Sequence, residues 1–320
     1  VYKRQSVHGM VRRVAAEDRS HRFWRLRHFL DKLHIHAGSL ESYASIISIV
    51  TKIKPNEIYH LGAQSYIDYA FKDEFSTINT NINGTHFLLS AIKEFSPKTK
   101  FYFAGTSEMF GKVQEIPQCE STPFYPRSPY GIAKLYAHWM TVNYRESYNI
   151  FAASGILFNH ESPLRGKEFV TRKITDNLSK IKLGKLDVLE LGNMNAKRDW
   201  GFARDYVEGM HLMLQTDVPD TFVLASGQEA SVRDFVELTA NALDFKIKWV
   251  GTKEDEVGID ASTGKTIVKV NPNFYRPTEV ETLLGCPEKA EKELGWKAKT
   301  TLKELCKMMV ESDLSRNENM

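Results

Sequence analysis

One tyrosine–lysine pair in the sequence has the residue types and the spacing for acid–base chemistry. Tyr130 is the only one of 13 tyrosines with a lysine, Lys134, four residues further on. On a helix these two side chains share a face, with Cβ atoms about 5–6 Å apart. A tyrosine that exchanges protons near neutral pH must have its pKa lowered by about three units, roughly 4 kcal/mol, and a nearby ammonium favours the phenolate. The pair therefore indicates acid–base catalysis, although a core tyrosine beside a surface lysine fits these two residues alone at least as well.

The elements that would position this pair alternate between strands and helices. We expect strands at Ser6–Val11, Leu33–Ala37, Glu57–Leu61, Lys100–Ala104 and Phe151–Ile156, and helices at Ser42–Lys52, Thr80–Glu94 and Tyr130–Tyr148. Strands separated by helices predict right-handed crossovers and a parallel sheet with helices on both faces. The fold class is therefore α/β and doubly wound.

The alternation of predicted strands and helices becomes less regular after Phe158. Helices are expected at Phe169–Leu183, Asp205–Gln215 and Ser231–Leu243, and polar loops at Asn159–Lys167 and Gly192–Arg198. This predicts a smaller second lobe that is interwoven with the first. The tail after about Leu314 is expected to be frayed.

Composition and charge exclude several classes of protein. The 43 basic and 40 acidic residues give a net charge of +3, too balanced to favour nucleic acid or an anionic membrane as a partner. Cys119, Cys286 and Cys306 lie far apart in the sequence, so neither a metal site nor a disulfide framework is indicated. No apolar run is long enough to span a bilayer and no signal-peptide pattern is seen, which makes the cytoplasm the default location.

The region where a dinucleotide would bind lacks one expected feature. Doubly wound domains usually place a glycine-rich turn after the first strand to receive the diphosphate, and no GxGxxG or GxxGxxG occurs in this sequence. The chain begins with Val1 and enters the Ser6–Val11 strand almost at once. We therefore expect that the first strand and its glycine-rich turn are missing from the sequence.

Basic residues follow the Ser6–Val11 strand, where an acidic residue would bind a ribose 2′-hydroxyl. Arg12 and Arg13 stand there, and arginine suits a 2′-phosphate, so NADP is favoured over NAD. A solvated basic loop is the alternative. After the Glu57–Leu61 strand, the run from Gly62 to Ser65 would lie at the carboxyl end of the sheet, where such folds bind ligands, although a plain turn also fits.

Several long blocks of sequence are more specific than the tyrosine–lysine pair. The first runs from Phe101 to Lys134 and includes Thr-Ser-Glu-Met-Phe-Gly and Pro-Phe-Tyr-Pro-Arg-Ser-Pro-Tyr-Gly. Further blocks are Gly155–Pro163, Phe169–Lys173, Ala196–Gly201 and Tyr275–Val280. Together these blocks give the chain a resemblance, over nearly its whole length, to the GDP-mannose 4,6-dehydratase family of extended short-chain dehydrogenases/reductases. It implies a Rossmann-type NADP-binding domain at 1–157 and about 199–226, and a nucleotide-sugar-binding lobe at about 158–198 and 227–320. It also implies a homo-oligomer, a dimer or a tetramer.

The family mechanism assigns roles to residues in these blocks. By resemblance, Tyr130 takes the proton of the sugar's C4 hydroxyl, with Thr106 sharing it and Lys134 favouring the phenolate. Glu108 then removes the C5 proton that the C4 ketone has made acidic, and protonates the departing C6 hydroxyl. NADP would act catalytically and give a GDP-4-keto-6-deoxy sugar. An exposed glutamate at a strand end is the alternative for Glu108.

The binding residues are likewise expectations from the resemblance. For the substrate, the basic residues among them also supply the positive charge that binding of a diphosphate needs. For the cofactor they are Arg12, Ser39, Leu40, Leu61, Ala63, Ser65, Tyr130, Lys134, His160 and Arg165. For the GDP-sugar they are Ser65, Ser107, Glu108, Asn159, Lys173, Arg198, Arg276 and Glu279. One block departs from the family, which usually has Gly-Asp-Leu where this chain has Gly38-Ser39-Leu40.

Three other functions stay open from the sequence. Dehydratases of GDP-D-glycero-manno-heptose look very similar, and no motif reads the C6 substituent. A non-catalytic NADP-binding member of the fold would be expected to lack Glu108, Tyr130 or Lys134, and all three are present. An epimerase or reductase is disfavoured by Glu108, because neither reaction needs an elimination.

Overall fold

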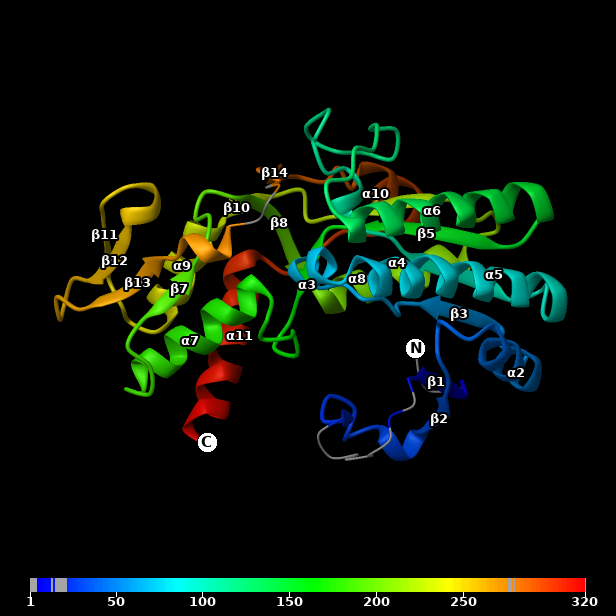
Figure 1. The fold of residues 1–320 in the computed structure, drawn as a ribbon, viewed down its shortest axis with the longest axis horizontal. Coiled ribbons are helices and arrows are strands. Elements are labelled where there is room, and N and C mark those ends of the chain that lie inside the picture. Colours follow the sequence, from blue (N-terminus) through cyan, green and yellow to red (C-terminus); the bar gives the residue numbers. More distant parts are fainter. Residues whose placement is uncertain (1–4, 13, 15–21, 276–277, 279, 320) are drawn as a thin grey trace.

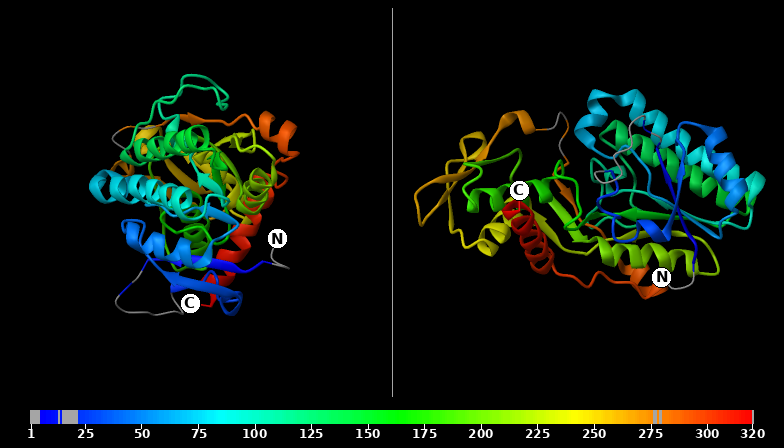
Figure 2. Two further views of the ribbon diagram at one scale, coloured as in Figure 1. Left: turned by 90° about the vertical axis from the view of Figure 1, so that its right-hand side faces the viewer. Right: turned by 90° about the horizontal axis from the view of Figure 1, so that it is seen from below.

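The computed structural model describes residues 5–12, 14, 22–275, 278 and 280–319, and it has two lobes of unequal size (Figures 1 and 2). In the larger lobe four parallel strands are ordered β3-β4-β5-β9: β3 (Glu57–His60), β4 (Lys100–Ala104), β5 (Ala152–Leu157) and β9 (Thr221–Leu224). The α/β class with parallel strands is confirmed.

Helices cover both faces of this sheet because alternate strand residues point to opposite sides. Phe101 and Phe103 of β4 pack against α2 (Tyr43–Ile53), α5 (Gly84–Phe95) and α6 (Pro129–Tyr148). Tyr102 packs on the other face, against α8 (Ala203–Gln215) and beside α10 (Glu288–Leu294). The doubly wound arrangement follows from this division of the core.

The first two strands form a sheet of their own. β1 (Val7–Val11) pairs in parallel with β2 (Leu33–Ala37), with Val7 opposite Leu33. Met10 and Leu40 of this segment pack against the cluster beneath α2 and α5. Within the described residues no strand pairing joins β1–β2 to the four-stranded sheet.

The helix expected at Thr80–Glu94 is interrupted. The structure has α3 (Ile67–Lys72) and α4 (Glu74–Ile78), then a π-helical turn, η2 (Asn79–Asn83), and then α5. Buried Asn81 in this turn accepts a hydrogen bond from the Gln64 backbone at 2.9 Å, and its amide donates to the Gln64 carbonyl at 3.0 Å. The turn thus ties the helix start to the segment that follows β3, a contact that helical periodicity does not reveal.

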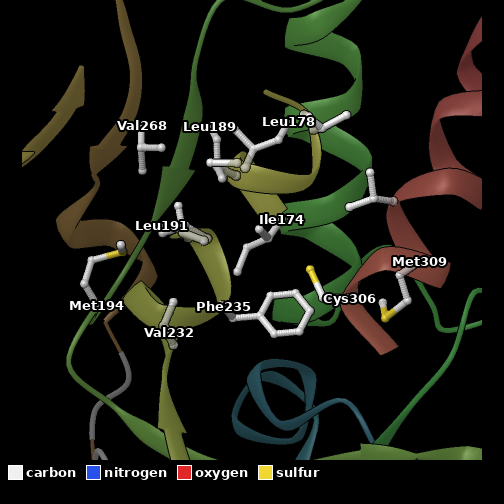
Figure 3. Packing of buried hydrophobic residues seen from close by; sticks show 14 of the residues in the cluster. Ile174, Leu178, Leu189, Leu191, Met194, Val232, Phe235, Val268, Cys306 and Met309 are labelled. Atoms are coloured by element: carbon white, nitrogen blue, oxygen red, sulfur yellow. The ribbon is translucent and has the colours of Figure 1, made fainter. Parts of the chain in front are cut away.

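The second lobe encloses a separate hydrophobic core. Its sheet has the order β11-β12-β13-β7: β11 (Ile247–Val250), β12 (Val257–Asp260), β13 (Thr266–Val270) and β7 (Leu189–Leu191). Three helices, α7 (Val170–Lys182), α9 (Val232–Ala242) and α11 (Leu302–Glu318), pack beside it. Figure 3 shows Ile174, Leu178, Phe235 and Met309 meeting between these helices and β7.

Short strands connect the two lobes. β8 (Lys197–Phe202) pairs with β6 (Asn159–Glu161), β10 (Glu229–Ser231) and β14 (Thr282–Leu283). The loops expected at Asn159–Lys167 and Gly192–Arg198 therefore each contain strand residues, a correction that reflects pairing between distant segments. The remaining short turns are η1 (Leu30–Lys32), η3 (Ser107–Met109), η4 (Lys253–Asp255) and η5 (Pro272–Phe274).

The expectation of a frayed tail after Leu314 is wrong. Helix α11 continues to Glu318, and Asn317 is buried with its amide donating to the Asp176 carbonyl at 3.3 Å. Arg316 donates to the Pro163 carbonyl at 2.7 Å. These contacts with α7 and the loop after β6 hold the last turn, which polar composition alone did not predict. Among the described residues no helix has the length and apolarity to cross a membrane.

Candidate active site

A cavity of about 810 Å³ opens where β3, β4 and β5 end and the second lobe begins. Residues that directly follow all three strands line it, as expected because the carboxyl ends of parallel strands share one edge of a sheet. α7 and the loop after β7 close the opposite side.

Most of the residues that the sequence singled out meet in this cavity. The lining includes Leu61, Ala63, Ser65, Thr106, Ser107, Glu108, Tyr130, Lys134, Asn159, His160, Arg165, Lys173 and Arg198. Arg12, Ser39 and Leu40 are not among the lining residues; they follow β1 and β2, which form a sheet separate from the four-stranded one. Arg276 and Glu279 lie outside the described residues.

The first turn of α6 places Tyr130 against the Glu108 segment. The Ser128 hydroxyl caps the helix by accepting from the Gly131 N–H at 3.0 Å, and Pro129 occupies the first helical position. A Cβ on Gly131 would lie 2.8 Å from the Glu108 carbonyl oxygen. Glycine at 131 therefore allows the helix start to touch the turn that carries Glu108.

Thr106 links the Tyr130 phenol to the backbone of Glu108. Its hydroxyl hydrogen-bonds the Tyr130 side chain and accepts from the Glu108 N–H at 3.3 Å, so it also caps η3. Burial and, to a smaller extent, the nearby Glu108 raise the pKa of Tyr130 to about 12, despite the lowering effects of Thr106 and Arg165. We expected Lys134 to lower the pKa of Tyr130. The protein residues alone do not produce this lowering, because desolvation of the phenol outweighs their effects.

Lys134 lies beneath the tyrosine as a buried ammonium. Its Nζ donates to the Ala104 carbonyl at 2.8 Å and lies 6.0 Å from the centre of the Tyr130 ring. Burial lowers the pKa of Lys134 to about 8. Because that value is still above neutral pH, the side chain remains mostly charged at pH 7.

His160 and Arg165 approach the cavity from the segment after β5. His160 is held by its Nδ1 contact with the Phe158 carbonyl at 2.9 Å and by stacking on Tyr206. The Arg165 guanidinium lies 3.5 Å from the centre of the Phe169 ring, and its Nε lies 3.1 Å from the Glu161 carboxylate. Both groups line the cavity, and Arg165 is near enough to Tyr130 to lower its pKa.

Basic side chains line the part of the cavity in the second lobe. Lys173 lies over the Phe274 ring with its Nζ 3.6 Å from the ring centre, and burial lowers the pKa of Lys173. Arg198 is buried and donates to the Val280 carbonyl at 2.7 Å. Lys197, also basic in the sequence, forms an ion pair with Glu229 at 2.9 Å and is not among the lining residues.

Sequence reasoning missed several lining residues on the second lobe. Lys167, Asp176, Asn177, Lys180 and Asn193 all line the cavity. Asp176 forms ion pairs with Lys167 at 3.1 Å and Lys180 at 2.7 Å. The i,i+4 spacing of Asp176 and Lys180 on a helix was the one available signal, and it fits an ordinary surface pair equally well.

Comparison with known proteins identifies the relatives of this chain. The family model for GDP-mannose 4,6 dehydratase matches residues 1–309. The GDP-mannose 4,6 dehydratase of Dictyostelium discoideum is 52% identical over 291 residues, covering 90% of this chain and 82% of that protein. The enzyme of the same name from Cricetulus griseus is 49% identical over 98% of this chain and 86% of its own length.

Solved structures show the same fold at low sequence identity. RMD from Pseudomonas aeruginosa complexed with NADPH has a TM-score of 0.76 at 22% identity, covering 92% of this chain and 95% of that one. DesIV, a dTDP-glucose 4,6-dehydratase from Streptomyces venezuelae with NAD and TYD bound, has a TM-score of 0.79 at 18% identity, covering 96% and 88%. By the family match and the close relatives, this chain belongs to the GDP-mannose 4,6-dehydratase family.

Proposed function

We propose that this protein is an NADP-dependent lyase that converts GDP-mannose into GDP-4-keto-6-deoxymannose. The reaction consists of oxidation at C4, loss of water across C5–C6 and return of hydride to C6. The observation that carries the proposal is that Glu108, Thr106 and Tyr130 line one cavity, with the Thr106 hydroxyl bonded to the Tyr130 phenol and to the Glu108 backbone N–H, and with Glu108 close enough to raise the pKa of Tyr130. A carboxylate beside the acid–base tyrosine is what an elimination requires in addition to an oxidation.

The residues divide the proton transfers between them. A bound nicotinamide dinucleotide supplies the acceptor and the later donor of hydride. Tyr130 takes the C4 hydroxyl proton and Thr106 shares it through their hydrogen bond. Glu108 removes the C5 proton and gives a proton to the departing C6 hydroxyl, so that one side chain acts as base and then as acid. Lys134 keeps a positive charge beneath the phenol and so favours its ionised form.

The residues that line the cavity fit the nicotinamide half of such a cofactor. Lys134 is 3% exposed, and the described hydrogen bonds give its Nζ one acceptor, the Ala104 carbonyl, although an ammonium has three donors. A ribose hydroxyl could accept another of these hydrogens. Tyr130, His160 and Arg165 would complete that half of the site. Arg12, Ser39 and Leu40 remain proposals for the adenosine half.

Binding of oxidised NADP should lower the pKa of Tyr130 below its value of about 12, because the nicotinamide ring adds a positive charge beside the phenol. The pKa can be followed by NMR of tyrosine labelled with ¹³C at Cζ, with Tyr130→Phe used to assign the resonance. Reduced NADP, whose ring is neutral, is the control and should shift the pKa less. Equal pKa values with the two forms would contradict this account.

The preference for NADP over NAD is a second expectation. Arg12 is exposed beside β1, and its carbonyl accepts a hydrogen bond from Arg22. A charge-assisted contact between Arg12 and a 2′-phosphate should make NADP bind about tenfold or more tightly than NAD, equivalent to about 1.4 kcal/mol or more. Arg12→Ala should remove most of that difference in a calorimetric titration, whereas Arg27→Ala should leave it. Equal affinities of the unaltered protein for both dinucleotides would refute the assignment.

The sugar nucleotide is proposed to lie between the sheet edge and the second lobe. Lys173 and Arg198 supply positive charge there for the diphosphate, while Ser65, Ser107 and Asn159 supply hydrogen-bonding groups at the strand ends. Product analysis with GDP-mannose and GDP-D-glycero-manno-heptose in parallel tests the substrate. Formation of the 4-keto-6-deoxy product from GDP-mannose supports the proposal, and turnover of the heptose alone would replace it. The cytoplasmic location and the homo-oligomer that the resemblance implies remain proposals.

A further inference from the structure

Two of the three cysteines follow a pair of bridged residues that lie outside the lining of the cavity. Gln118, in the loop between β4 and α6, forms an isolated parallel bridge with Gly285, just after β14. The Gln118 N–H donates to the Leu284 carbonyl at 2.8 Å, and the Cys286 N–H donates to the Gln118 carbonyl at 2.9 Å. Continuing this register by one residue places Cys119 opposite Cys286.

At this bridge the Gln118 side chain, and the side of Gly285 where a Cβ would lie, face the protein core. Gln118 is fully buried, and a Cβ built on Gly285 would lie 2.3 Å from the Ala225 Cβ. Successive side chains of extended chains point to opposite sides, so Cys119 and Cys286 face outward together. Both are half-buried rather than enclosed.

The spacing of the two segments suits a disulfide. Paired strands lie about 4.7–4.9 Å apart, and disulfides join residues whose Cα atoms are about 4.4–6.8 Å apart. In this register the Cβ atoms of the two cysteines lie on the same side of the paired segments. A disulfide requires this, because its two Cβ atoms must be close together.

The two thiols differ in reactivity. The Cys119 Sγ lies 3.1 Å from the Ser121 hydroxyl and 3.5 Å from the Thr122 hydroxyl, and these contacts lower the pKa of Cys119. Burial raises the pKa of Cys286. Cys119 is therefore the better nucleophile at neutral pH, because the thiolate is the reactive form.

We propose that Cys119 and Cys286 form a reversible disulfide when the protein meets a low-molecular-weight disulfide such as oxidised glutathione. The Cys119 thiolate attacks one sulfur of the oxidant, forming a mixed disulfide and releasing one glutathione thiolate. The Cys286 thiolate then attacks the Cys119 sulfur and releases the second, so that the two protein thiols are oxidised and one glutathione disulfide is reduced to two thiols. The bond would tie the loop that precedes α6 to the segment after β14, and it does not depend on the proposed enzymatic function.

Mass spectrometry of the intact, full-length protein after treatment with oxidised glutathione tests the proposal. The mass should fall by two hydrogens, and peptide mapping should find Cys119 linked to Cys286, reversibly with dithiothreitol. Cys286→Ser should stop at a stable glutathione adduct on Cys119, whereas Cys119→Ser should react more slowly. Cys306→Ala is the matched control and should behave as the unaltered protein, because Cys306 is buried and burial raises its pKa to about 11.

Three results would overturn the proposal. The first is an unaltered protein that carries glutathione on both cysteines without an internal link. The second is a link that includes Cys306. The third is no reaction at Cys119 under conditions that oxidise an unfolded sample of the same chain.

Discussion

Replacement of Glu108 by glutamine should lower the rate of formation of 4-keto-6-deoxy product by about 10²–10⁴-fold, the usual contribution of a positioned acid–base group. The amide is nearly isosteric with the carboxylate but can neither remove the C5 proton nor protonate the C6 hydroxyl. Binding of GDP-mannose should change little, because the contacts proposed between the nucleotide and Lys173 and Arg198 do not involve the Glu108 carboxylate. Chromatography of the product and calorimetry of binding measure the two quantities separately.

The control for this variant is Glu146→Gln, which removes the same charge from an exposed position on α6. It should turn over at the normal rate. Exchange of the C5 hydrogen with deuterated solvent gives a second readout, since it requires the base and does not require the later return of hydride. A Glu108→Gln protein that still exchanges this hydrogen would show that another group is the base.

The sequence predicted the large-lobe elements well because their patterns are local. The bounds of β2 and β4 are those expected, β1 and β3 differ by one residue at one end, and β5 is shifted by one residue at both ends. Alternating or fully buried strand positions and helical spacing are visible within about ten residues. Strand β8, by contrast, forms by pairing with β6, β10 and β14, which are distant from it in the sequence. The residues of β8 themselves therefore show no local pattern that predicts a strand.

The candidate site was predicted in part for a similar reason. Residues directly after β3, β4 and β5 had to meet at one sheet edge, and Ser65, Glu108 and Asn159 do line one cavity. The pKa values of the site residues could not be predicted in the same way. The high pKa of Tyr130 depends on burial, which the spacing of Tyr130 and Lys134 does not encode. The division of the chain into two domains at about residues 157, 199 and 226 remains a proposal.

A buried ion pair between α7 and α11 leads to the second large expected effect. The Arg172 Nε contacts both carboxylate oxygens of Asp313, at 2.7 and 2.8 Å, and its Nη2 lies 2.6 Å from one of them. Both side chains are almost fully buried. Arg172 also donates to the carbonyls of Pro163 at 2.9 Å and Arg165 at 2.8 Å, in the loop that follows β6.

Asp313→Asn should therefore lower the free energy of unfolding by about 3–5 kcal/mol, because it leaves the Arg172 guanidinium buried without a counter-charge. Glu311→Gln is a matched control on the same helix. Glu311 pairs with Lys307 at 3.9 Å with both side chains exposed, so its loss should change the free energy of unfolding by about 0–1 kcal/mol. Urea unfolding of both variants measures the difference, provided that the transition is two-state.

Adding Arg172→Met to an Asp313→Leu protein should restore part of the stability that Asp313→Leu loses, because the second change removes the unpaired charge. Recovery would show that the cost arises from desolvation of the guanidinium. Catalysis should not recover with it, because methionine cannot hold the Arg165 carbonyl that fixes the loop beside the cavity. If stability and kcat/KM returned together in the double variant, Arg172 would serve the packing of the second lobe without orienting Arg165.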